Sequence, residues 1–162
     1  MKEYFTTATA VGKNIQVDDA KIIFKNFSGN PSKYNHDGDR NFVWCIEDPE
    51  IAEFMRNEGY NVREYESPDG DISWRLKINC KFSQYGPKVF IEEGGRRYRL
   101  DEDTIHKLDS LSISRFDMDI RPYDWEIKGD KGRSAYLDSC CAVHNTHVCR
   151  FEVSDIEEVE EV

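Results

Sequence analysis

The sequence predicts a mainly β fold with two short α-helices, and three observations support this class. Aromatic residues make up 12% of the 162 residues and fall in short segments separated by turn residues. Apolar and polar residues alternate over segment 74–82, which is the period of a strand with one buried face. Helical spacing of apolar residues is confined to two short segments. The length is that of one ordinary domain with a usable core.

The first part of the chain holds one weak and two strong strand signals. Residues 1–19 are small and polar, and they predict an N-terminal arm or a loosely held first strand. Segment 21–25 predicts a strand, and segment 42–46, which is apolar at every position, predicts a strand covered on both faces. The polar, glycine-rich loop 27–40 between them is longer than packing requires, so it is either a binding element or a mobile spacer.

A first helix is predicted over residues 49–58. Asp48 supplies an N-cap, Pro49 suits the first helical position, and Gly59 is placed to end the helix. The chain then returns to an extended conformation over residues 60–65.

The next strand, 74–82, predicts a basic surface. Its apolar side chains share one face, and the opposite face carries Arg75, Lys77, Asn79 and Lys81. Segments 88–92 and 96–100 flank a pair of glycines, which is typical of a tight hairpin. The returning strand of this hairpin carries Arg96, Arg97 and Arg99 around Tyr98.

The last third of the chain predicts a second helix and a long pair of strands. Acidic residues 101–103 suit the positive end of a helix dipole, and apolar residues follow at helical spacing. Segment 116–126 alternates as a strand, turns at 129–132 and returns over 135–143. A last short strand is expected at 147–153.

These elements give roughly six to eight strands, which predicts an OB-fold-like Greek-key β-barrel. We expect the barrel to span residues 20–151 and to precede a disordered acidic tail at 152–162. The formal net charge is −10, and the tail holds six acids and no base, so −10 minus −6 leaves −4 for the remaining residues. Charge is therefore segregated along the chain, and the total does not exclude nucleic acid as a partner.

The acidic tail has two interpretations. Tethered to a basic cleft, it would compete with phosphates and offer a docking peptide to basic partner proteins. The alternative is a tail that only promotes solubility. The candidate partner-binding residues are Glu157, Glu158, Glu160, Glu161 and Val162.

Basic and aromatic residues occur together along the predicted strands and loops. Proteins that bind single strands need both, because cations neutralise phosphates and flat rings stack on bases of any sequence. For any one strand, the alternative is an ordinary solvated face. The leading hypothesis is a non-catalytic module that binds single-stranded DNA with little sequence preference. Its candidate residues are Lys33, Tyr34, Arg40, Arg75, Lys77, Lys81, Tyr85, Lys88, Arg96, Arg97, Tyr98 and Arg99.

Two other function classes stay open. One is an acidic protein-interaction module, or a DNA mimic that inhibits a basic protein. The other is a metal-dependent nuclease, whose carboxylate pairs would be Asp37 with Asp39 and Asp117 with Asp119. The favoured explanation of these pairs is structural: Asp37 and Asp39 suit a glycine-rich turn, and Asp117 and Asp119 suit the wet face of an alternating strand.

Zinc ligands occur close together near the end of the predicted barrel, but their spacing is poor. They are Cys140, Cys141, His144, His147 and Cys149. The sequence has no nucleophile elbow and no phosphate-binding loop motif, so we expect no catalytic residue, metal or cofactor. The first residues lack the apolar core of a signal peptide, and no apolar run approaches the roughly 18 residues of a membrane span. We therefore expect a cytoplasmic protein with no membrane partner.

Several segments resemble a family of small phage and prophage proteins. They are Phe27-Ser28-Gly29 leading to Lys33-Tyr34-Asn35, then 38–42, 100–104 and 120–126, and the resemblance covers residues 21–143. Members are similar to OB-fold single-stranded DNA-binding proteins of phage replication, in which an acidic C-terminal tail contacts replication partners.

The resemblance implies further DNA contacts and protein partners. The implied contacts are Tyr34, Arg40, Tyr123 and Trp125. Arg121, in the same segment as the last two, is a further candidate DNA contact. The implied partner of the tail is a polymerase, helicase or recombinase of the bacterial host cell or the phage, and a homo-oligomer is one of the assembly states left open. The chain departs from the family pattern after Cys141, which leaves the end of the barrel undetermined.

Overall fold

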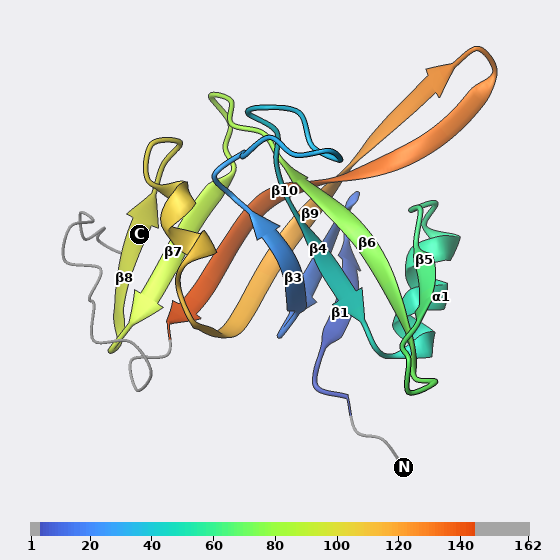
Figure 1. The fold of residues 1–162 in the computed structure, drawn as a ribbon, viewed down its shortest axis with the longest axis horizontal. Helices are drawn as coiled ribbons and strands as arrows, with labels where there is room; N and C mark the ends of the chain where they lie inside the picture. Colours follow the sequence, from blue (N-terminus) through green and yellow to red (C-terminus); the bar gives the residue numbers. More distant parts are fainter. Residues whose placement is uncertain (1–3, 145–162) are drawn as a thin grey trace.

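The computed structural model describes residues 4–144 of the chain (Figure 1). This part contains ten strands, one α-helix and one 3-10 helix. In chain order they are β1 (Thr7–Val11), β2 (Asn14–Asp18), β3 (Lys21–Asn26), β4 (Arg40–Ile46), α1 (Pro49–Asn57), β5 (Arg63–Glu66), β6 (Ile72–Cys80), β7 (Lys88–Glu93), β8 (Arg96–Leu100), η1 (Ile105–Asp109), β9 (Ile113–Ile127) and β10 (Asp130–His144). The predicted strand at 147–153, the domain boundary at 151/152 and the acidic tail lie outside the described residues.

Five strands form a partly open barrel, which confirms the mainly β, OB-fold-like class. Their order is β3–β4–β6–β10–β9, and β10 lies parallel to β6 at Ala135 and Tyr136. A backbone hydrogen bond from Ala20 N–H to the Phe116 carbonyl, at 2.7 Å, joins the chain just before β3 to β9 and brings the two edges together. The hairpin β7–β8 continues the sheet beside the second half of β10.

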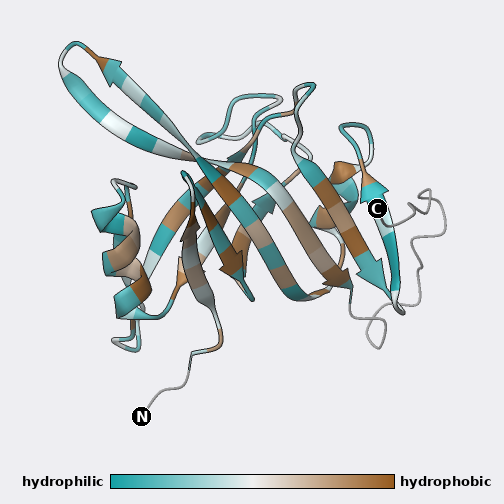
Figure 2. Cartoon of the chain, turned by 180° about the vertical axis from the view of Figure 1, so that it is seen from behind, coloured by the Kyte–Doolittle hydropathy of each residue, from teal (hydrophilic) through white to brown (hydrophobic). Residues whose placement is uncertain are grey.

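The core lies inside this curled sheet. Figure 2 shows hydrophobic and hydrophilic bands alternating along the barrel strands, as expected when one face of each strand is buried. Phe42 is fully buried at the centre of the core, where its ring lies 5.2 Å from the ring of Phe27 and 5.5 Å from that of Phe116. Such tilted and edge-on ring pairs are favourable packing geometries.

The N-terminal residues form more structure than the predicted arm. Residues 7–18 make the hairpin β1–β2, and β2 pairs with β9. Ile15 and Val17 are buried in the core, so their alternation with polar neighbours is that of a strand with one buried face. The folded body therefore includes residues that the sequence prediction left outside the barrel, because their two apolar side chains are a weak signal without the neighbouring strand.

One predicted helix is confirmed and the other is shorter than expected. In α1, the side chain of Asp48 accepts a hydrogen bond from the backbone of Glu50 at 2.9 Å, as an N-cap does. The second helix is the five-residue 3-10 helix η1. Its buried residues, Ile105 and Leu108, are three positions apart, a spacing that a 3-10 turn satisfies without a further turn of α-helix. None of the helices in residues 4–144 is long and apolar enough to cross a membrane.

Strands β9 and β10 are fifteen residues each and extend well beyond the barrel. In residues 121–134, which we call the arm, β9 and β10 pair with each other and with no other strand. Figure 1 shows the arm projecting from one end of the barrel. The turn at its tip uses Lys128 and Gly129, both with positive φ, rather than the predicted residues 129–132.

Candidate nucleic-acid interface

One outer surface of the barrel is basic and carries no carboxylate. We call it the barrel face, defined by the outward side chains of β4, β5 and β6, which the strand register brings together. These are Asn41, Val43, Cys45, Arg63, Tyr65, Ser73, Arg75, Lys77 and Asn79. Outward residues on β6 follow one another at about 7 Å, so the cations of this strand form a row. Lys81 continues the row just past the end of β6.

At one end of this row lies a cluster of aromatic rings and an arginine. Tyr136 on β10 stands opposite Asn79 on β6, so its side chain continues the barrel face. The guanidinium of Arg121 lies 5.1 Å from the Tyr136 ring centre. The ring of Tyr123 packs edge-on against the ring of Tyr136, with 5.7 Å between the ring centres. The predicted residues Arg121 and Tyr123 thus meet a tyrosine that the sequence prediction missed.

Trp125 lies flat on the arm, and its position depends on a glycine. Its indole packs across β10 at Gly132, where a Cβ atom would overlap indole carbons Cζ2 and Cε2. Trp125 stays more than one-third exposed, so the indole presents a face to solvent. Aromatic faces of this kind are stacking platforms for nucleobases.

Arg133 fixes the base of the arm. Its guanidinium donates two hydrogen bonds to the Asp124 carboxylate, at 2.6 and 3.1 Å, and a third to the carbonyl of Glu58 at the end of α1. Hydrogen bonds from Arg133 lower the pKa of Asp124 below its ordinary value of 3.8, so this pair is ionised at neutral pH. Both side chains lie on the opposite side of the arm from Tyr123 and Trp125.

Two exposed tyrosines are held by turns of the same design. In the turns 32–35 and 83–86, the first and fourth residues exchange backbone hydrogen bonds in both directions. In each turn the tyrosine N–H donates to the serine hydroxyl at 3.2 Å. The rings of Tyr34 and Tyr85 are 87% and 82% exposed, and Figure 1 shows both loops at the end of the barrel from which the arm projects. Each turn therefore holds a tyrosine away from the body of the protein.

The other predicted residues near these loops have different surroundings. Tyr85 borders a hollow of about 300 Å³ that Arg121 also lines. Lys33 lies with its ammonium 5.7 Å from the ring of Tyr34. Arg40 points toward the barrel interior at the rim, where it donates to the Phe27 carbonyl at 3.0 Å. It also forms an ion pair with Glu102 and stacks on Phe82, so Arg40 orders the loop that carries Tyr34.

The β7–β8 hairpin carries the remaining predicted residues on a separate surface, which we call the hairpin surface. Arg97 and Arg99 lie over the ring of Phe90, at 5.7 and 6.0 Å. Carboxylates lie near both arginines, because Glu92 is the cross-strand partner of Arg97, and Asp101 and Glu102 line one hollow with Arg99. Arg96 is exposed and faces Glu93 across the hairpin, and Lys88 stands opposite Ser139, whose hydroxyl donates to Asp119. Tyr98 is half-buried and packs against the core.

The alternative sites do not assemble among residues 4–144. Asp117 accepts from the backbone of Asp19 and from Arg115, and no group of three or more metal-ligating side chains converges in this part of the chain. Burial raises the pKa of the Cys140 thiol well above its ordinary value and that of Cys141 to a lesser degree. His144 binds Glu93 at 2.7 Å. The other two predicted zinc ligands, His147 and Cys149, lie outside the described residues.

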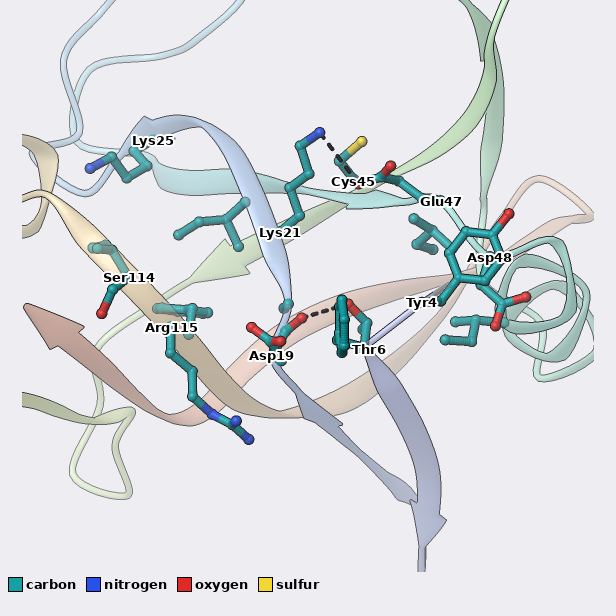
Figure 3. Close-up of a pocket in the computed structure, with 17 residues that line it drawn as sticks. Tyr4, Thr6, Asp19, Lys21, Lys25, Cys45, Glu47, Asp48, Ser114 and Arg115 are labelled. Atoms are coloured by element: carbon teal, nitrogen blue, oxygen red, sulfur yellow. Dashed lines mark hydrogen bonds and ion pairs between the residues drawn. The ribbon is translucent and has the colours of Figure 1, made fainter. Parts of the chain in front are cut away.

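A cavity of about 440 Å³ adjoins the barrel face at Cys45 and lies between the N-terminal residues and the starts of β3 and β9 (Figure 3). Two of the cations that line it form ion pairs: Lys21 pairs with Glu47 at 3.4 Å, and Arg115 pairs with Asp117 at 3.1 Å. Lys25 donates to the carbonyls of Leu108 and Leu111, and burial lowers its pKa. These groups stabilise the fold.

Three comparisons place the chain among known proteins. The family model described as "Putative phage ssDNA-binding domain" matches residues 6–162. The structure is similar to the single-stranded DNA-binding protein of bacteriophage Enc34 in its C-terminally truncated form, with 12% identity, a TM-score of 0.56, and coverage of 90% of this chain and 97% of that one. The same phage protein in complex with ssDNA gives 12% identity and a TM-score of 0.55, over 82% and 87% of the two chains. No curated protein sequence matches the chain.

Proposed function

Because the chain belongs to the phage ssDNA-binding domain family, we propose that it binds single-stranded DNA on the barrel face and the arm, with little sequence preference. Lysine and arginine side chains neutralise phosphates, and exposed aromatic rings stack on bases. The proposal assigns no chemical step to the protein.

The observation that carries this proposal is the distribution of charge. The chain has a net charge of −10, yet the outward side chains of β4, β5 and β6 include three cations and no carboxylate. An overall positive field cannot attract DNA to this protein, so a local basic surface must do so. In OB-folds, the face of the second and third barrel strands is where oligonucleotides bind, together with two flanking loops. Here those strands are β4 and β6, and the flanking elements are the loop with Tyr34 and the arm.

Stacking supplies the part of the affinity that does not depend on charge. Tyr123, Trp125 and Tyr136 lie on the side of the arm and barrel that is continuous with the barrel face. Tyr34 and Tyr85 project at the adjoining end. Base stacking on such rings tolerates every base, so we expect binding to oligonucleotides of different sequence to differ little.

A binding measurement tests the proposal. Fluorescein-labelled oligo(dT) should show increased anisotropy with the protein at low salt, and the affinity should fall as salt rises. Lys77→Ala should weaken binding, whereas Lys21→Ala, which removes a lysine paired with Glu47, should not. Absence of binding at low salt would refute the proposal, and capture of basic proteins instead would favour a DNA mimic. Strand cleavage that needs Mg²⁺ and disappears in Asp117→Ala would favour a nuclease.

We assign residues 152–162 a second role, as a docking segment for a replication or recombination protein in the bacterial host cell. The six acids of this segment support the role, because they would compete with phosphates for the basic surface when no partner is present. Deleting residues 152–162 should then strengthen oligo(dT) binding. Unchanged affinity would limit the segment to partner contact.

A further inference from the structure

An arginine lies between two aromatic rings at the end of the barrel face away from the arm. The guanidinium of Arg75 stacks 3.7 Å from the ring centre of Tyr65, and the ring of Phe24 lies 5.2 Å from it on β3. We call these three residues the aromatic sandwich. Neither ring was among the residues predicted from the sequence.

The charge of Arg75 is held in place but not neutralised. Its Nε atom is buried and has no hydrogen-bond partner, and no carboxylate among the described residues pairs with the side chain. Arg63 stands directly opposite Arg75 on β5. Like charges that face each other across a strand pair destabilise the sheet, and an anion bound between them would relieve this repulsion.

Phe24 is exposed to solvent and has an unfavourable backbone conformation. Its φ is +52°, in the left-handed region, and its ring is 65% exposed. A bulky residue with positive φ is rare and strained, and such residues concentrate at ligand sites. The break in the β3–β4 register between Ile23 and Asn26 turns this side chain outward instead of into the core.

We infer that the aromatic sandwich binds one nucleotide of the DNA strand, with its phosphate on Arg75 and Arg63 and its base stacked on Phe24. This inference rests on the proposed function and extends it, because it sets the end of the DNA track. Arg75 and Asn79 are four residues apart on β6, about 13 Å, so the sandwich and the Arg121–Tyr136 cluster bind different nucleotides of one strand. The sandwich therefore increases the length of DNA that the protein covers.

Affinities for oligonucleotides of different lengths test this inference separately from the proposed function. We would measure the affinity for oligo(dT) of about 4 to about 16 nucleotides, the range of site sizes for one OB-fold. Phe24→Ala should leave binding of the shortest bound oligonucleotide unchanged and weaken binding of the longest by about tenfold. Phe5→Ala, which removes a 71% exposed ring beside the cavity of Figure 3, is the matched control and should change neither value.

Phe24→Gly distinguishes a ligand-binding ring from a structural one. Glycine accepts positive φ without strain, so this variant should keep or raise the melting temperature while it loses the same tenfold affinity. A lower melting temperature with unchanged affinity would overturn the inference, as would an equal loss at every length. If the unmodified protein binds no oligonucleotide, the proposed function fails first. If it binds normally and Phe24→Ala changes nothing, only the inference fails.

Discussion

The barrel face and the hairpin surface both carry arginines stacked on aromatic rings, yet their electrostatic surroundings differ. On the barrel face, Arg75 lies between Tyr65 and Phe24 with no carboxylate beside it. On the hairpin surface, Arg97 lies over Phe90 with Glu92 opposite it on the neighbouring strand. The residue types are alike, and the difference lies in the neighbouring strands, which supply acids on one side only. A cation bound by carboxylates has little charge left for a phosphate, so the barrel face is the better site for DNA.

Removing positive charges should produce the largest difference in DNA affinity between the two surfaces. The variant Arg75→Gln/Lys77→Gln should bind oligo(dT) about 10- to 100-fold more weakly near physiological salt, because two phosphate contacts are lost. The slope of log affinity against log salt should become shallower by about 1.4. Arg97→Gln/Arg99→Gln should change affinity less than about threefold and leave the slope nearly unchanged, because acids already balance these charges. Anisotropy titrations at several salt concentrations measure both variants, and equal losses would mean that the two surfaces act alike.

The arm should respond to the loss of its stacking platform. Trp125→Ala should weaken binding about tenfold, the value expected for one stacked base. Gly132→Ala should have a similar effect, because the added methyl group displaces the indole from β10. A double-mutant cycle checks this mechanism: if Gly132→Ala acts through Trp125, the two effects will not add. Additive losses would show that Gly132 has a separate role.

The contact between the arm and α1 should have a smaller effect. Arg133→Ala removes the hydrogen bonds to Asp124 and Glu58, so the arm should move more freely and bind DNA about threefold more weakly. Lys131→Ala, an exposed substitution on the same strand, is the control for lost charge. Hydrogen exchange of residues 121–134 measures the expected increase in mobility. Unchanged exchange in Arg133→Ala would mean that strand pairing alone fixes the arm.

The smallest expected effect is that of pH on this same contact. The lowered pKa of Asp124 means that the ion pair with Arg133 stabilises the folded arm above the ordinary value of 3.8, and that the stabilisation is lost as pH falls through the lower folded value. We therefore expect the stabilisation of the folded arm by this ion pair to stay the same between pH 7 and pH 5. An NMR titration of the Asp124 carboxyl group should give a midpoint below 3.8, and Arg133→Ala should return it toward that value.

Local sequence signals were sufficient to predict most of the strands and the first helix. The N-cap before α1 and the proline at its first position, the alternation along β6 and the glycine pair between β7 and β8 each depend on neighbouring residues only, so the pattern predicts the element directly. The second helix and the residues of β1 and β2 were less well predicted, since a short apolar pattern becomes a 3-10 turn or a strand only through its tertiary neighbours.

The sequence by itself determined the mainly β class, the order of the strands along the chain and the separation of an acidic terminal segment from a body with basic strands. Only the tertiary structure decided which basic residues share a surface. Strand pairing places Phe24, Tyr65 and Tyr136 beside Arg75 and Asn79, although long stretches of chain separate them. The same pairing sets Arg97 opposite Glu92 and Tyr98 against the core. The physical reason is that a pattern along one strand fixes which side chains point outward, whereas the electrostatic field they experience comes from the strands on either side.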